Sequence, residues 1–383
     1  MIPRLAEKEL LKLARQYYVV AVVGPRQSGK TTLIKKVFKD RPYVNLEAPD
    51  VRSFAEEDPR AFLEPYTLTG AVFDEAQRVP KLFSYLQVII DENKKPGHFI
   101  LSGSNNFLLQ ENISQSLAGR VSYINLLPFS IEELGSLNEK NIAEMLFKGF
   151  YPPVYDRQIA SGSWYNNYIR TYIERDVRQL KGIENLATFE RFLKLCAGRV
   201  GQLLNKNSLG IAAGVDSKTV ESWLSVLEAS FVIFRLRPHH KNFNKRVVKM
   251  PKLYFYDVGL AVTLLGVQNA EQVNLHPFKG ALFENLVIVE YLKQRWNSAK
   301  PNNLYFWRNS RGNEIDLLLD QGNALSPIEI KAGKTITPDF FKGLKYWQSL
   351  TANKGGTIVY AGDTVQKRSN GIVVKPYNKI ISR

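Results

Sequence analysis

The amino-acid sequence predicts an α/β protein: a parallel sheet with helices on both faces, then a mostly helical part, then a second α/β part. Three observations predict this order. An apolar run at residues 17–23 leads into a glycine-rich loop and a helix, a helix–turn–helix–strand pattern occupies residues 207–237, and short strands follow at residues 313–319 and 327–331. The 383 residues are enough for two or three domains with ordinary cores.

The first predicted element is a buried strand. Residues 17–23 are β-branched or aromatic, with one alanine, and end at a glycine. A run that is apolar on both faces is typical of a central parallel strand covered by helices. Downstream, Leu33, Ile34, Val37 and Phe38 form one apolar stripe at helical spacing. The sequence therefore predicts a strand, a loop and a helix in succession.

The loop between them has the phosphate-binding pattern GxxxxGK[ST]. Its glycines let backbone amides surround phosphates, and the helix N-terminus adds a positive dipole. Lys30 is expected to reach the β- and γ-phosphates, and the Thr31 hydroxyl is expected to bind magnesium. The nucleotide-binding residues predicted from this motif are Gly24, Pro25, Arg26, Gln27, Ser28, Gly29, Lys30, Thr31 and Thr32.

Carboxylates and hydroxyls follow the next two apolar strands. Residues 71–73 lead into Asp74 and Glu75, the pattern of a Walker B element, in which Asp74 holds magnesium through water and Glu75 polarises the attacking water. Residues 98–101 lead into Ser102 and Ser104, either of which is a candidate to contact the γ-phosphate or the water. A plain turn at the strand end explains these serines equally well.

Phosphoryl transfer also needs positive charge on the phosphates, often from an arginine. Arg120 is the first candidate, and Arg26 and Arg78 are alternatives. Surface ion pairs explain most arginines, so the choice among the three stays open.

At this point the sequence resembles a prokaryotic AAA+-like ATPase family whose members carry a C-terminal domain of uncharacterised function. The resemblance rests on residues 24–32, 73–77, 101–104 and 116–120, and on the later stretches 172–177 and 251–260. It implies ATP as the nucleotide, ATP hydrolysis, and assembly of several copies into a ring, in which Arg120 is a candidate to act across subunits. We take residues 1–135 as the ATPase domain.

The middle part, residues 136–252, has the order of a winged helix-turn-helix. A short helix closes at Gly214, and a second helix carries Val220, Trp223, Leu224 and Leu227 on its apolar face. Residues 235–252 then contain seven basic residues and no acidic one. The residues expected to contact nucleic acid are Lys218, Arg235, Arg237, Lys241, Lys245, Arg246 and Lys249, with Lys252 as the seventh basic residue of the run. Docking of a protein is the alternative, because Glu221 on the exposed face repels DNA.

The last part, residues 253–383, resembles the core of PD-(D/E)XK nucleases. Asp316 lies on one predicted strand, Glu329 and Lys331 on the next, and Glu284 on an apolar helix upstream. In such a site Asp316 and Glu329 hold a divalent metal and Lys331 positions the water. Pro327 precedes Glu329 rather than Asp316, which departs from the family pattern. An ion pair on a sheet face is the alternative explanation.

Composition excludes several other classes. One cysteine and four histidines rule out a disulfide framework and a histidine- or cysteine-rich metal site. No run approaches the roughly 20 apolar residues of a membrane span, so a cytoplasmic protein is expected.

The net charge of +16 indicates a polyanionic partner. The primary hypothesis is therefore an ATPase that acts on DNA, such as branched or damaged DNA. A nucleotide-gated switch or scaffold that binds a protein, and an ATP-regulated metal-dependent endonuclease, are the alternatives.

Overall fold

The computed structural model describes residues 2–104, 113, 115–137, 141–173, 185–239, 248–351 and 355–380. The chain divides into two units, one of residues 1–129, 229–231 and 293–301, the other of residues 130–228, 232–292 and 302–383. Each unit is described separately below. The domain boundaries expected at residues 135 and 252 stay predictions.

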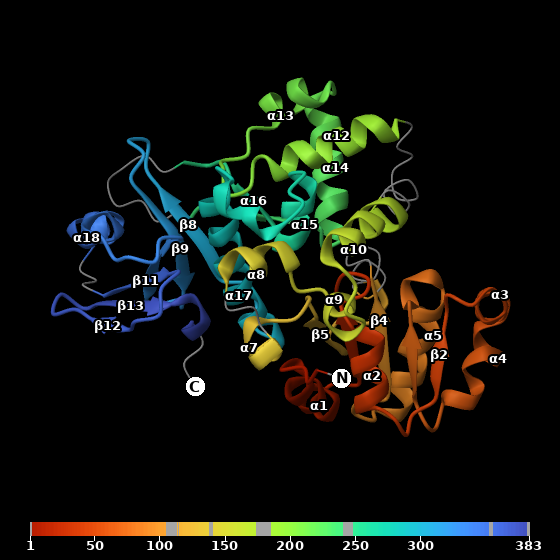
Figure 1. Cartoon of the computed structure of the whole chain (residues 1–383). Coiled ribbons are helices and arrows are strands. Elements are labelled where there is room, and N and C mark those ends of the chain that lie inside the picture. Colours follow the sequence, from red (N-terminus) through yellow and green to blue (C-terminus); the bar gives the residue numbers. More distant parts are fainter. Residues whose placement is uncertain are drawn as a thin grey trace. The chain divides into compact units, whose positions relative to one another are not determined.

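The first unit, which contains the red and orange elements of Figure 1, is built on a five-stranded parallel sheet with the strand order β2-β3-β4-β1-β5. Strand β4 lies between β1 and β3, so the carboxyl ends of these three strands meet at one edge. The elements are α1 Ala6–Gln16, β1 Val19–Val23, α2 Lys30–Val37, β2 Tyr43–Asn45, α3 Pro49–Glu57, α4 Pro59–Leu63, β3 Ala71–Asp74, α5 Leu82–Asn93, β4 Phe99–Gly103 and β5 Val121–Asn125.

Helices cover both faces of this sheet. On one face, Leu10 of α1 and Ile34 of α2 pack with Val20, Val72 and Ile100 of the strands. On the other face, Phe62 of α4 contacts Phe73, and Phe73 contacts Phe99. The predicted parallel sheet with helices on both faces is therefore confirmed for this unit.

The second unit begins with helices. Its helical elements are α7 Ile131–Leu134, α8 Ile142–Lys148, α9 Pro152–Asp156, α10 Ser161–Tyr168 followed by a π-helical turn Ile169–Ile173, α12 Leu186–Ala197, α13 Lys206–Ala213, α14 Ser217–Ala229, α15 Val258–Leu264, α16 Ala270–Leu275, α17 Lys279–Asn297 and α18 Lys342–Leu350. Helices α13 and α14 are joined at Gly214, whose φ of +80° favours glycine. Strands β6 (Ile233–Leu236) and β7 (Lys252–Phe255) follow as an antiparallel pair. The expected helix–turn–helix–strand order is thus present.

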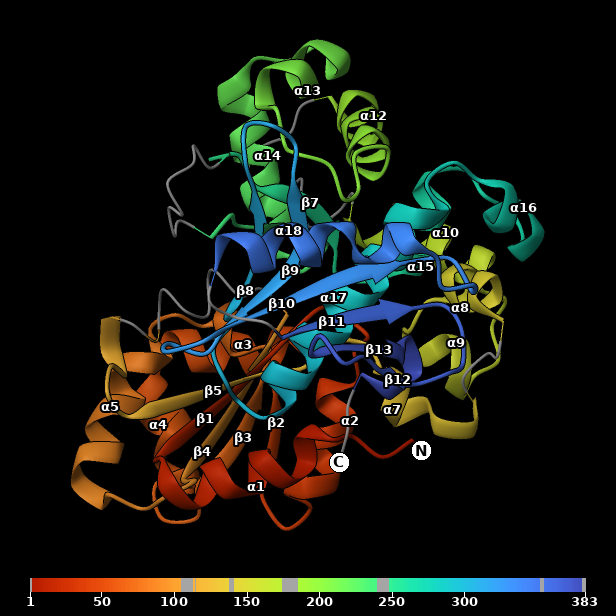
Figure 2. The same ribbon diagram turned by 90° about the vertical axis from the view of Figure 1, so that its left-hand side faces the viewer.

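A second sheet occupies the carboxyl-terminal part of this unit. Its strands are β8 Leu304–Arg308, β9 Glu314–Asp320, β10 Leu325–Lys331, β11 Gly356–Tyr360, β12 Gln366–Lys367 and β13 Ile372–Pro376, in the order β12-β13-β11-β10-β9-β8. Strands β8, β9 and β10 are antiparallel neighbours, whereas β11 is parallel to β10. A parallel neighbour requires a crossover, and α18 supplies it. Figure 2 shows α18 lying over β9 and β10.

The core between α18 and this sheet is aromatic. Trp347 of α18 packs edge-to-face on Trp307 of β8, within a buried cluster that includes Leu344 and Tyr360. A C-terminal α/β sheet domain, as predicted, is therefore present. Among the helices that the structure describes, we find none with both the length and the apolar character of a membrane span.

Candidate functional site

The phosphate-binding loop connects β1 to α2 and depends on its two glycines. Gly24 has a φ of +157°, and a Cβ there would lie 2.2 Å from the Leu126 carbonyl oxygen. Gly29 has a φ of +93° directly before the first residue of α2. These positions let the backbone curl tightly, as the motif predicts. Thr32 lies on the exposed side of α2.

Lys30 is folded back onto this loop. Its ammonium donates to the main-chain oxygens of Gly24 at 2.9 Å and Pro25 at 2.8 Å, and the residue is 5% exposed. Burial lowers the pKa of Lys30 to about 8, against the opposing attraction of the nearby carboxylates. Ser28 Oγ is also buried and has no hydrogen-bond partner among the described residues. The loop thus holds a buried cation and a buried hydroxyl, both suited to a phosphate group.

Asp74, at the end of β3, is the centre of a hydroxyl network. Thr31 donates to its Oδ2 at 2.7 Å and Tyr43 to the same oxygen at 2.5 Å, while Ser102 donates to Oδ1. Burial and the hydrogen bond to Asp74 raise the pKa of Tyr43. The order of strands explains the arrangement, because β4 places Ser102 between the loop and Asp74. The network brings together oxygen atoms that suit magnesium.

Glu75 lies beside this network in an unusual backbone conformation. Its φ of +54° lies in the left-handed region, and its side chain accepts from Ser104 at 2.9 Å and from Gln77 at 2.5 Å. The two donors hold Oε2 in one position. The structure therefore brings together both predicted carboxylates and both predicted serines at the edge where the loop begins.

The three candidate arginines lie in different surroundings. Arg120 pairs with Asp91 at 2.6 Å on the surface, and its carbonyl oxygen accepts from Val19 at the amino end of β1. The phosphate-binding loop starts at the carboxyl end of that strand, so Arg120 lies at the opposite edge of the sheet. Arg26 and Arg78 both lie near Glu47, at 3.7 Å and 3.8 Å. Arg120 is not brought to the loop of its own chain.

Sequence reasoning missed three residues that support this site. Tyr43 and Gln77 donate to Asp74 and Glu75, the two carboxylates predicted to act in catalysis. Arg4 donates to the Ser28 carbonyl oxygen in the loop and to the Leu127 carbonyl oxygen, both at 2.6 Å. Gln77 lies in the stretch 73–77 that carries the family resemblance, but the sequence gives it no role. Tyr43 and Arg4 belong to no such stretch, and their contacts depend on a strand order and a chain path that the sequence does not display.

The nuclease-like residues form a second constellation, in the second unit. Lys331 lies 2.5 Å from Glu329 and 3.4 Å from Asp316, so these three predicted residues are together. Burial raises the pKa of Glu329 to about 8, and the charge of Asp316 adds to the shift. Oxygen atoms of Glu284, Glu314 and Asp316 lie within 4.8 Å of one another. We call these three residues the carboxylate cluster.

Lys252 lies inside this cluster. It is 3% exposed, its ammonium lies 3.0 Å from Glu284 Oε1, and it also pairs with Glu314. Burial disfavours its charged form, but the surrounding carboxylates outweigh this effect and raise the pKa of Lys252. Lys252 is the last of the seven basic residues at 235–252, but its charge is neutralised inside the second unit, so it is not available to phosphates. No spacing in the sequence predicts the contact with Glu314.

The residues expected to contact nucleic acid differ in their exposure. Lys218, Arg237 and Lys249 are exposed. Arg235 is half-buried and bonds to Glu228 at 2.5 Å and to Glu221 at 2.7 Å, so its positive charge is neutralised within the unit. Lys241, Lys245 and Arg246 lie outside the described residues.

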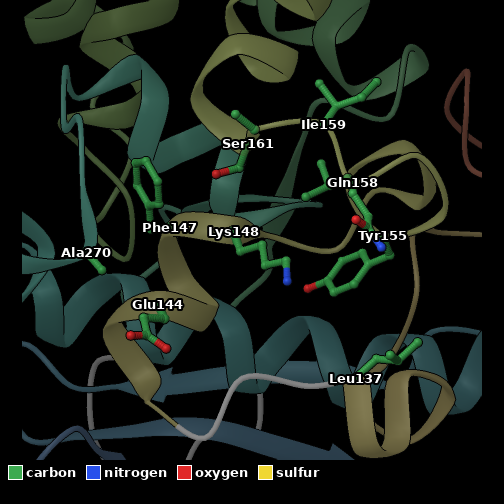
Figure 3. A pocket seen from close by; sticks show the side chains of 11 residues that line it. Leu137, Glu144, Phe147, Lys148, Tyr155, Gln158, Ile159, Ser161 and Ala270 are labelled. Carbon is green, nitrogen blue, oxygen red and sulfur yellow. The ribbon is translucent and has the colours of Figure 1, made fainter.

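A groove of about 630 Å³ elsewhere in the second unit contains none of the predicted site residues. Figure 3 shows Lys148 next to Tyr155 on its wall, and the Lys148 ammonium lies 4.7 Å from the centre of that ring. Apolar side chains such as Val154 and Ile159 and polar ones such as Glu144 and Gln158 also line it. The groove therefore has no part in the two constellations described above.

Comparisons with known proteins place the chain in a family. It is 32% identical over 369 residues to the uncharacterized protein Rv2008c of Mycobacterium tuberculosis, covering 95% of this chain and 81% of that protein. The chain belongs to the family of this mycobacterial protein. The uncharacterized protein MJ1544 of Methanocaldococcus jannaschii is 22% identical over 337 residues, covering 79% of this chain and 72% of that one.

Domain models divide this family member into three segments. Residues 16–135 match an AAA domain, residues 139–271 a domain of unknown function (DUF8612), and residues 279–380 a domain of unknown function (DUF4143). Among solved structures, a Walker-type ATPase of Pyrococcus abyssi is similar at 14% identity and a TM-score of 0.46, covering 68% of this chain and 94% of that chain.

The match of residues 16–135 to an AAA domain confirms the predicted AAA+-like ATPase domain. That assignment supports ATP binding and hydrolysis as the general activity. The winged-helix and nuclease-like assignments fall in the two domains of unknown function and stay predictions.

Proposed function

We propose that the protein is a magnesium-dependent ATPase whose second unit contacts DNA. The observation that carries the first part is the convergence of Lys30, Thr31, Asp74 and Glu75 at one edge of the sheet, with Thr31 and Asp74 joined by a 2.7 Å hydrogen bond. A phosphate-binding loop alone provides nucleotide binding. A loop beside two carboxylates also provides groups that hold the metal ion and activate the attacking water for hydrolysis.

The donor set fits the metal that this chemistry uses. A hydroxyl and a carboxylate are hard oxygen ligands, so Thr31 and Asp74 are the residues that hold Mg²⁺. Magnesium neutralises the charge on the β- and γ-phosphates when it is bound.

The remaining residues act on the triphosphate and the attacking water. The Lys30 ammonium leaves the carbonyl oxygens of the loop for the phosphates, which are stronger acceptors. Glu75, held by Ser104 and Gln77, accepts the proton of the water that attacks the γ-phosphorus. The bond between that phosphorus and the bridging oxygen then breaks, which releases phosphate and ADP.

Phosphate release from ATP and magnesium tests this proposal. We expect Lys30→Ala to lower ATP affinity by at least about tenfold and Thr31→Ala to raise the magnesium concentration needed for turnover. Lys36→Ala is the matched control, because Lys36 is exposed on the same helix and pairs with Glu7 rather than with the loop. Unchanged turnover in Lys30→Ala would show that the measured ATPase belongs elsewhere.

Contact with DNA is favoured by charge and topology together. The chain carries a net charge of +16, and the exposed cations Lys218 and Arg237 lie on α14 and just after β6, the two elements with which a winged helix contacts a duplex. Arg235 contributes little, because two glutamates neutralise it.

Fluorescence anisotropy with duplex, single-stranded and branched DNA at several salt concentrations tests this contact. We expect Lys218→Glu with Arg237→Glu to weaken binding and to reduce its salt dependence. The ATPase rate is measured with each DNA in parallel. Salt-insensitive binding, or none, with an unstimulated ATPase would favour the alternative of a nucleotide-gated protein scaffold.

A further inference from the structure

The carboxylate cluster of the second unit already contains a cation. The Lys252 ammonium lies between Glu284 and Glu314, pairs with both, and is almost fully removed from solvent. Tyr254 donates to the same Glu284 oxygen that Lys252 contacts. The place where a divalent ion would bind two carboxylates is therefore filled by the protein's own side chains.

The secondary structure explains why these groups meet. Lys252 and Tyr254 are two residues apart on β7, so both side chains leave the strand on one face, toward α17. Glu314 and Asp316 have the same spacing on β9. The pairing of β7 with β6 fixes the position of Lys252, since Lys252 is opposite Leu236.

Two more oxygens of the cluster are also engaged. Arg308 bonds to Glu314 Oε2 at 3.0 Å. The backbone N–H of Ile330 donates to Asp316 Oδ2 at 2.7 Å, and Lys331 contacts the same oxygen. A divalent ion needs direct oxygen ligands at short range, and here it would lie beside a buried ammonium of the same sign.

The second candidate pair, Asp316 and Glu329, also has a lysine between its carboxylates, because Lys331 contacts both. The other oxygen of Glu329, Oε1, is buried without a hydrogen-bond partner among the described residues and is turned toward α18, where a Cβ on Gly343 would lie only 2.0 Å from it. In both groups of carboxylates, therefore, a lysine ammonium of the protein already lies where a divalent cation would bind.

We propose that the Lys252 ammonium takes the place of the divalent cation in the carboxylate cluster, so that this nuclease-like sheet does not bind a catalytic metal. The internal cation ties β7 to α17 and β9 and thereby joins the helix-turn-helix part of the second unit to its sheet. This proposal is independent of ATP hydrolysis, which it neither requires nor affects.

Manganese binding to the full chain without nucleotide tests the proposal, with free Mn²⁺ measured by electron paramagnetic resonance. We expect wild type and Asp316→Asn to bind Mn²⁺ equally weakly. Lys252→Met removes the charge and nearly keeps the volume, so it should gain about tenfold or more in Mn²⁺ affinity. Adding Asp316→Asn to Lys252→Met should abolish the gain.

Two results would overturn the proposal. One is a wild-type Mn²⁺ site, or DNA nicking in Mn²⁺, that Asp316→Asn removes. The other is a folded Lys252→Met chain that gains no site. If Lys252→Met does not fold, as judged by circular dichroism, the comparison of wild type with Asp316→Asn decides alone. Loss of ATPase in Lys30→Ala leaves these readouts unchanged, which separates this test from that of the ATPase.

Discussion

We expect the replacement of Glu75 by glutamine to separate ATP binding from ATP hydrolysis. Glu75 Oε2 accepts two hydrogen bonds, from Ser104 and Gln77, and an amide oxygen at that place accepts both as well. The geometry is therefore kept, whereas the ability to take a proton is lost. General-base catalysis contributes about 10²–10⁴ in rate, which equals roughly 3–5 kcal/mol of activation free energy.

The expected result is a fall in kcat by that factor with an ATP affinity within about threefold of wild type. Phosphate release measures the first quantity, and titration with a fluorescent ATP analogue measures the second. Ser104→Ala is the companion variant: it removes one of the two donors but leaves the base, so its kcat should fall only about tenfold. Normal turnover in Glu75→Gln would mean that Glu75 is not the base. A lost affinity would mean that its role is structural.

Three further predictions concern stability, the buried thiol and assembly. Tyr165→Phe should lower the free energy of unfolding by about 1.5–3 kcal/mol in urea titrations, because the buried hydroxyl donates to Asp257 at 2.5 Å; a change below about 0.5 kcal/mol would contradict this. Cys196 is buried, and burial raises the pKa of its thiol. Labelling of this thiol by a maleimide should therefore stay slow as the pH rises from about 7 to 9 and become fast only in urea. Rapid labelling of the folded chain would disprove the burial. If Arg120 serves the site of a second copy, mixing inactive Arg120→Ala and Lys30→Ala chains should restore part of the ATPase; no recovery, with both chains folded, would exclude that role.

The phosphate-binding part of the fold was predictable because its signals are local. A run of apolar β-branched residues, a glycine-rich loop and an apolar helical stripe lie next to one another in the chain, and each specifies its own element. Asp74 and Glu75 were recognisable for the same reason, since they directly follow a short apolar strand.

The supporting contacts were not predictable because they depend on strand order. Tyr43 reaches Asp74 only because β2 pairs with β3 in parallel, and the residues themselves carry no pattern that sets this neighbour. Arg120 is a residue that the sequence singled out but that the fold places away from the loop. It follows a glycine in a conspicuous motif, yet the register of β5 with β1 places it at the far edge of the sheet.

Charge was the least reliable guide. The basic run at residues 235–252 contains Arg235 and Lys252, and both are neutralised by carboxylates inside the second unit. Lys252 and Glu314, which neutralise each other, lie far apart in sequence. A count of basic and acidic residues along the chain does not show such a pair and therefore assigns Lys252 to the surface charge.

The contact of Arg4 with Ser28 has a practical consequence for anyone who prepares this protein. The guanidinium supports the backbone of the loop through a carbonyl oxygen, and it lies three residues after Met1. A substitution or deletion at Arg4 therefore removes a contact of the loop itself, although this residue lies far from the loop in sequence. Nucleotide affinities measured on chains shortened in this region deserve comparison with those of the full 383 residues, before a weak value is attributed to the phosphate-binding motif.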